Sequence, residues 1–222
     1  MAKFNSRPPQ DQAPYAVANE LICGRLGLMI GLPVPPGVVV TVEDDNLAYI
    51  SLRFGPKGEL PPPVIPEHLA EDYPSIAAGI IAFDCWIGNE DRHAGNVAYV
   101  RGQTQRPVTI FDHSHALLGF ERDKAVERLR RRIDEPFIAG CLPPVVKSSR
   151  EFREWASRIS AVSSGLIRDT CGAVVHSDGI TTDECAAAVN FLVHRKDRVL
   201  EKIRSAEGAM PHVGQWELNE AS

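Results

Sequence analysis

The sequence lacks a long hydrophobic run, and it lacks the glycine-rich signatures of the common nucleotide sites. No apolar stretch approaches the roughly 18 residues that cross a bilayer, so we expect no membrane span. The patterns G-x-G-x-x-G and G-x-x-x-x-G-K-[ST] are absent, which leaves a Rossmann or P-loop site without support. G-x-S-x-G is also absent, so a serine hydrolase built on a nucleophile elbow has no support either.

Cysteine is sparse and scattered. The five cysteines among 222 residues form no Cys-x-x-Cys pair. An odd, dispersed set is typical of reduced thiols that fill small core positions. The first ten residues, MAKFNSRPPQ, contain no apolar signal core. We therefore expect a cytoplasmic protein with free thiols.

Positive charge is also limited, because the net charge is −5 and 24% of the residues are charged. A mildly acidic chain argues against general binding of nucleic acid or membrane surfaces. The main basic run is RLRRR at 128–132, within DKAVERLRRRI. We expect that segment to form a surface helix whose arginines are solvated.

The first part of the chain predicts a helix followed by two strands. Apolar residues recur at helical spacing over 15–30, and Gly31 with Pro33 marks the end of that helix. The β-branched run 37–42 and the segment 48–54 read as strands. The Pro- and Gly-rich connector 55–66 then predicts a boundary, with a front part at 1–58, a rear part at 59–208 and a tail at 209–222.

The rear part is predicted to be mainly helical. A buried helix over 73–88 leads into a polar turn, and 97–100 with 108–111 reads as a short hairpin. The last helix starts at the capping box Thr181 to Glu184 and is expected to run to Gly208 as scaffold.

Polar side chains are concentrated in the turn NEDRHAGN at 89–96. Asp91 and Asn96 lie before the predicted hairpin, and Asp112 lies just after it. A hairpin would bring these three residues to one rim. Carboxylate and amide oxygens are ligands that suit Mg²⁺ holding a phosphate, and phosphoryl transfer needs metal and one carboxylate that orients the attacking hydroxyl.

The same residues resemble a family. D-R-H-x-x-N followed by a short hairpin and a hydrophobic pair before Asp is similar to HipA-like kinases and, more distantly, to phosphatidylinositol kinases. VANELICGRLGLMIGLPVPPGVVV resembles the front-lobe helix and strand of that family, and the likeness covers roughly residues 1 to 120. It implies an α+β, protein-kinase-like, two-lobed fold with a reduced N-terminal lobe, and transfer of the ATP γ-phosphate to a protein Ser or Thr.

The resemblance also implies roles for the residues of the loop. Asp91 would be the catalytic base that orients the acceptor hydroxyl, and Arg92 and His93 would shape the catalytic loop around it. Asn96 and Asp112 would be the Mg²⁺ ligands that bind the nucleotide.

Two further residues are implied at the nucleotide. Lys3 would contact the α- and β-phosphates of ATP, and Glu20 would pair with Lys3 and hold it. Kinases of this type carry a phosphate-covering loop before the lysine, whereas the given sequence begins two residues before Lys3 and its GPKG at 55–58 comes too late. A degenerate kinase that acts by binding a partner, and a lipid or small-molecule kinase, therefore remain alternatives.

A transition-metal site is another alternative. Zinc sites use His and carboxylates, and His93, His113 and His115 are candidates. If the chain stays in a strand there, alternation places His113 and His115 on one face and Asp112 on the other. Convergence of the three histidines would favour zinc, whereas convergence of Asp91, Asn96 and Asp112 would favour a kinase.

Overall fold

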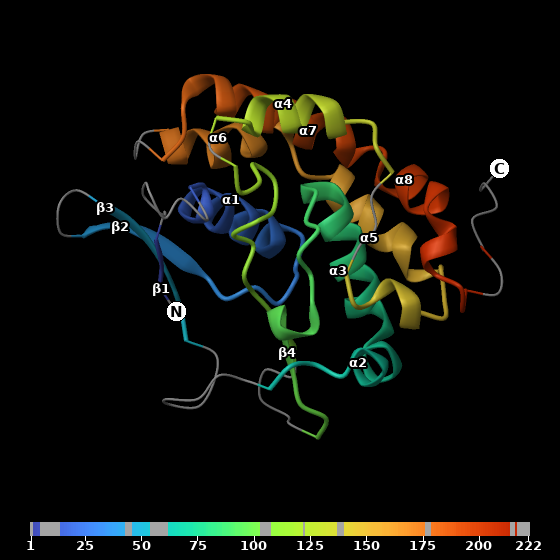
Figure 1. Ribbon diagram of the computed structural model, residues 1–222. Coiled ribbons are helices and arrows are strands. Elements are labelled where there is room, and N and C mark those ends of the chain that lie inside the picture. The colour runs from blue at the N-terminus through green and yellow to red at the C-terminus, as the bar shows by residue number, and fades with distance from the viewer. Residues whose placement is uncertain are drawn as a thin grey trace.

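The structure, a computed structural model, describes residues 2–4, 14–42, 46–53, 62–102, 108–121, 123–136, 140–175, 179–213 and 216. Its main elements are β1 (Ala2–Phe4), α1 (Ala16–Met29), β2 (Gly37–Val42), β3 (Asn46–Ser51), α2 (Pro66–Asp72), α3 (Pro74–Ile87), β4 (Val97–Tyr99), β5 (Val108–Ile110), α4 (Ala125–Arg132), α5 (Glu151–Ser160), α6 (Ser164–Val175), α7 (Thr182–Lys196) and α8 (Val199–Ser205). Two small antiparallel sheets are combined with a larger helical body (Figure 1).

The first sheet has the strand order β1-β3-β2, and α1 lies beside it (Figure 1). In the middle strand β3, Tyr49 is in register with Lys3 of β1 and with Val39 of β2. Two glycines make room for the Tyr49 ring. A Cβ at Gly37 would lie 2.3 Å from it, and a Cβ at Gly24 of α1 would lie 3.1 Å from its hydroxyl. Small residues at these positions therefore allow the sheet to pack closely on α1.

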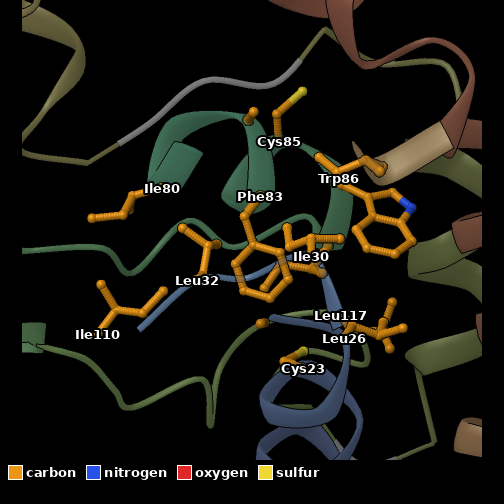
Figure 2. Close-up of a cluster of buried hydrophobic side chains, with 14 of the residues drawn as sticks. Cys23, Leu26, Ile30, Leu32, Ile80, Phe83, Cys85, Trp86, Ile110 and Leu117 are labelled. Atoms are coloured by element: carbon orange, nitrogen blue, oxygen red, sulfur yellow. The ribbon is translucent and has the colours of Figure 1, made fainter. Parts of the chain in front are cut away.

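The core is continuous from α1 to the helical body. Figure 2 shows Leu26 of α1, and Ile30 just after the end of α1, near the ring of Phe83, which comes from α3. All three side chains are buried. Burying an aliphatic or aromatic side chain of this size stabilises the fold by about 1.5–3 kcal/mol. The polar turn that follows α3 is thus attached to this buried core.

Helix α3 is surrounded by other helices. A Cβ at Gly79 would lie 2.4 Å from the Trp155 indole of α5, so only glycine allows this close contact. On α3, the Trp86 indole donates a hydrogen bond to the carbonyl of Leu192 in α7 at 2.9 Å. These contacts explain why the sequence of α3 is apolar on nearly all sides rather than amphipathic.

Several sequence predictions are confirmed. The first helix ends where expected, with Gly31 at a φ of 86°, a backbone region that favours glycine. The strand at 37–42, the buried helix and the short hairpin are all present. The predicted connector 55–66 lies largely outside the described residues. The sequence did not predict α2, a short helix with Pro66 at its first turn.

The prediction of one helix from Thr181 to Gly208 is wrong. The capping box is present, but α7 ends at Lys196 and α8 begins at Val199. The interruption is stabilised by the end of α5. There, the Lys196 ammonium donates to the Ser160 carbonyl at 2.8 Å, and the Ser160 hydroxyl bonds to the Asp197 carboxylate.

The expectation that the arginines of 128–132 are solvated is also wrong in part. The segment does form a helix, α4, but the Arg132 side chain is only 8% exposed and the Arg128 side chain only 17%. Both guanidinium groups face Glu90 in the polar turn. Separately, no helix among the described residues is long and apolar enough to cross a membrane.

Candidate active site

The polar turn begins where α3 ends. Gly88 adopts a left-handed φ of 65° and stops the helix. Asn89 is buried, and its side-chain nitrogen donates to the Asp84 carboxylate at 2.8 Å. Its side-chain oxygen accepts from the backbone N–H of Asp91 at 3.1 Å. Asn89 therefore fixes the backbone that presents Asp91, whose side chain is 42% exposed.

Arg92 is the buried centre of this turn. Its Nε and Nη2 each lie 3.0 Å from a carboxylate oxygen of Asp84, forming a bidentate pair. Burial disfavours the cation, but the Asp84 carboxylate outweighs burial and raises the pKa of Arg92. Nη1 donates to the carbonyls of Asn96 at 3.1 Å and Phe111 at 2.8 Å. One guanidinium thus joins the loop of Asp91 and Asn96 to the segment of Asp112.

Asn96 is held on both sides. Its side-chain nitrogen donates to the Asp91 carbonyl at 2.8 Å, and its own carbonyl accepts from the Phe111 N–H at 3.2 Å. Val97 and Ile110, the next residues inward on the hairpin, are register partners. In the described part of the chain, no group donates to the side-chain oxygen of Asn96, so that oxygen is available as a ligand.

Asp112 follows the hairpin in a strained conformation. Its φ is 59°, a left-handed value that costs a non-glycine residue about 1 kcal/mol or more. Its carboxylate accepts a hydrogen bond from the Ser114 hydroxyl at 2.6 Å. The carboxylate is half-buried, and such backbone outliers cluster at functional sites.

The structure ties Glu20 to the residue after Asp112. The Glu20 carboxylate accepts from the His113 N–H at 3.1 Å, and its other oxygen lies 3.4 Å from His113 Nδ1. The second contact does not have hydrogen-bond geometry. The predicted pair between Glu20 and Lys3 stays a prediction, because the side chain of Lys3 lies outside the described residues.

The three histidines have different surroundings. His93 is exposed, and its Nδ1 accepts from the Gly95 N–H at 3.0 Å, so it caps the short turn before β4. His113 is fully buried, and its ring meets that of Phe83 edge to face, with the ring centroids 5.8 Å apart. His115 is 41% exposed and its Nδ1 lies 3.4 Å from the Asp91 carboxylate.

The condition for His113 and His115 to share a strand face is not met, because β5 ends at Ile110 and the chain leaves the strand before these residues. Within the described ranges, no group of three His, Cys, Asp or Glu side chains is placed to hold a metal ion. The zinc alternative requires the three histidines to converge, and their separate surroundings do not support it.

Two further residues of the site, Asn19 and Asp84, were not predicted from the sequence. Asn19 of α1 donates from its side chain to the carbonyls of Ser114 at 2.7 Å and Gly119 at 3.2 Å. Its side-chain oxygen accepts from the Leu118 N–H at 3.1 Å. Asp84 could have been suspected, because it is a carboxylate in an otherwise apolar helix. Nothing in the spacing of Asn19 indicated its part in fixing the loop after Asp112.

Helix α4 also contacts the turn. Arg132 pairs with one carboxylate oxygen of Glu90 and with Glu135, the latter at 3.1 Å, while Arg128 lies 3.6 Å from the other oxygen of Glu90. Glu90 directly precedes Asp91, so these ion pairs join α4 to the loop that carries Asp91.

Comparisons with known proteins reveal a likeness of structure. No family model matches the chain, and no curated protein matches its sequence. A solved structure, the crystal structure of a Helicobacter pylori proinflammatory kinase CtkA, matches with a TM-score of 0.63 and 14% identity. The match covers 96% of this chain and 88% of that chain.

The chain has a kinase-like fold. At 14% identity the likeness shows the fold alone. The segment with Asp91 and the segment with Asp112 belong to this kinase-like fold, and Arg92 joins them.

Proposed function

We propose that the chain is a HipA-like kinase that transfers the γ-phosphate of ATP to a hydroxyl, most suitably that of a protein Ser or Thr. The observation that carries the proposal is the bonding of Arg92 to the carbonyls of Asn96 and Phe111. This bonding holds together two segments whose side chains suit phosphoryl transfer. The kinase-like fold supports the same function.

The residues present fit Mg²⁺. The side-chain oxygen of Asn96 and the carboxylate of Asp112 are hard oxygen donors, and two such protein ligands are typical of a Mg²⁺ that also binds phosphates. Mg²⁺ would neutralise phosphate charge. The strained backbone of Asp112 and the hydrogen bond from Ser114 fix the carboxylate in advance, so that binding requires little reorganisation.

Asp91 is the group that would receive the acceptor hydroxyl. Its carboxylate is 42% exposed, while its backbone N–H and carbonyl are bound by Asn89 and Asn96. In the transfer, the hydroxyl oxygen bonds to the γ-phosphorus, the bond from phosphorus to the β–γ bridging oxygen breaks, and ADP leaves. The hydroxyl proton passes to Asp91. Arg92 and His93 shape the loop.

Lys3 and Glu20 complete the proposal at the nucleotide. Lys3 is placed on β1 in register with Tyr49, whose ring packs on the helix that carries Glu20. We propose that Lys3 contacts the α- and β-phosphates and that Glu20 orients it, within a front part formed by 1–58 and a rear part formed by 59–208.

The test is Mg²⁺-dependent transfer of a labelled γ-phosphate from ATP to proteins of a cell lysate. The Asp91→Asn and Asp112→Asn variants should each lose at least about 100-fold of the activity, because each removes a charge that acts on the reacting groups. Asp169→Asn, at an exposed position of α6, is the matched control and should keep full activity.

Full activity of Asp112→Asn would refute the assignment. Absence of transfer by the folded parent would favour the alternative, a degenerate kinase that acts by binding. Binding of a fluorescent ATP analogue with and without Mg²⁺ would then show whether the nucleotide site is retained.

A further inference from the structure

A hollow of about 170 Å³ lies between the segment 118–121 and α4. Its polar lining contains three cations, Lys124, Arg128 and Arg131, and two carboxylates, Glu121 and Glu127. Leu118 and Phe120 supply its apolar wall. The hollow thus combines an aromatic surface with an excess of positive charge, in a chain whose net charge is −5.

The three cations of this hollow differ in how closely a carboxylate pairs with them. Lys124 forms a close pair with Glu121 at 2.6 Å. Arg128 lies 3.6 Å from Glu90 and shares that carboxylate with Arg132, which lies closer to it. Arg131 is exposed and has no ion pair of 4.0 Å or less among the described residues. Arg131 and Arg128 are therefore the cations left to attract an anion.

The surroundings of Arg128 favour such an anion. Burial, followed by the nearby charge of Arg132, lowers the pKa of Arg128. A cation that is partly desolvated and placed beside other cations gains more from an added anion than a fully solvated one does.

The backbone that forms the wall of the hollow is held in place by neighbouring residues. Gly119 has a φ of 81°, and a Cβ there would lie 2.8 Å from the Arg128 side chain. A glycine is therefore required for Arg128 to lie against this backbone. Asn19 binds the Gly119 carbonyl and the Leu118 N–H, so the loop is held from α1. A recognition surface of this kind is organised before any ligand arrives.

Side-chain contacts link the hollow to the carboxylate of Asp91, the proposed catalytic base. The ring of Phe120, which is 49% exposed, lies 5.7 Å from the ring of His115. His115 in turn lies 3.4 Å from the Asp91 carboxylate. From the other side, Arg128 reaches Glu90, the residue before Asp91. A group bound in the hollow would therefore lie beside a hydroxyl presented to Asp91.

We infer that this hollow recognises the acceptor: it binds an acidic side chain, Asp or Glu, located near the phosphorylated Ser or Thr of a protein substrate. Arg131 and Arg128 bind the carboxylate, and Phe120 packs against the peptide. The inference rests on the proposed function, because it takes Asp91 as the site of the hydroxyl. It adds the substrate class, an acidic segment of a protein.

The test uses the full chain and fluorescein-labelled peptides with a single Ser. Glu is placed in turn at each position on both sides of the Ser, and a matched series carries Gln. At one or more positions, the Glu peptide should bind the parent chain more tightly than its Gln counterpart. Fluorescence anisotropy should show a difference of about two- to fivefold, the amount expected for an exposed ion pair.

The matched variants are Arg131→Gln and Arg130→Gln, which remove the same charge from neighbouring positions of α4. Arg130 lines a different hollow, between α4 and α7. Arg131→Gln should abolish the preference for Glu, and Arg130→Gln should keep it. Equal binding of the Glu and Gln peptides by the parent, or a preference that survives Arg131→Gln, would overturn the inference.

Phosphate transfer to the same peptides separates the two proposals. Transfer without any preference for Glu would overturn the acidic site and leave the kinase standing. Conversely, Glu-specific binding that depends on Arg131, without transfer to any peptide or lysate protein, would overturn the proposed kinase activity and support the recognition site alone.

Discussion

The guanidinium of Arg92 binds both carboxylate oxygens of Asp84, at 3.0 Å each. The two side chains are 1% and 4% exposed, so the pair is buried. Replacing Arg92 with Met would leave the Asp84 carboxylate buried without its cation. We expect the free energy of unfolding to fall by about 3–5 kcal/mol, measured by urea denaturation.

A double variant provides the control for this pair. Asp84→Leu combined with Arg92→Met removes both charges together. It should be less destabilised than Arg92→Met alone, because no unpaired carboxylate remains. If the double variant lost as much stability as the sum of the two single variants, the ion pair would not be the source of the effect.

Gly79 offers a test of helix packing. An added methyl group would lie 2.4 Å from the Trp155 indole, so Gly79→Ala should destabilise the fold by about 1–3 kcal/mol through overpacking. Gly172 of α6 is the matched control, since a Cβ there meets nothing within 4 Å. Gly172→Ala should stabilise the protein by about 0.5–1 kcal/mol. Thermal unfolding of the two variants should move in opposite directions, and a shared direction would contradict the packing argument.

The capping box of α7 should have a measurable effect. The Thr181 hydroxyl accepts from the Glu184 N–H at 3.2 Å, and the Glu184 carboxylate accepts from the Thr181 N–H at 2.8 Å. Thr181→Ala should therefore lower the free energy of unfolding by about 1 kcal/mol, measured by urea denaturation. Thr182→Ala, at an exposed position one residue later, should change stability by less than about 0.5 kcal/mol. Equal losses at both positions would argue against the cap.

The cysteines should react slowly with alkylating reagents. All five are free thiols; Cys23, Cys85 and Cys171 are buried, and Cys141 and Cys185 are partly buried. Burial raises the pKa of Cys171 to about 12 and that of Cys185 above its usual value. A raised pKa leaves less thiolate at a given pH, so iodoacetamide should label the folded chain slowly at about pH 8 and faster as the pH rises.

Mass spectrometry should find the first label on Cys141 or Cys185, the two partly buried thiols. Rapid labelling of Cys171 in the folded chain would show that α6 opens readily. Denatured protein is the control and should react at all five positions.

Local patterns predicted much of the fold. The apolar spacing of α1, the β-branched run of β2 and the capping box of α7 each act over a few residues, and the structure shows all three. The break between α7 and α8 was missed because it depends on Ser160, which is remote in sequence. The short helix α2 was missed because it lies beside a Pro-rich connector.

The candidate site, like the fold, was predicted only where local sequence patterns determine it. The spacing of Asp91, Asn96 and Asp112 predicted a polar rim, because a hairpin between them is a local feature. Spacing did not reveal that Arg92 would be buried or that Asp84 would bind it, since a buried charge depends on the tertiary packing around it. Arg132 was expected in solvent for the same reason, although it packs against Glu90.

Helix α1 is anchored at three places along its length. The Tyr15 hydroxyl just before it bonds to the Glu184 carboxylate of α7, and Asn19 holds the loop after Asp112. Near its other end, the Arg158 guanidinium of α5 donates to the Ile30 carbonyl at 3.4 Å. Swinging α1 away would break all of these bonds together and uncover its apolar face. We therefore expect α1 to behave as part of the rigid frame, with any hinge motion restricted to the three-stranded sheet beside it.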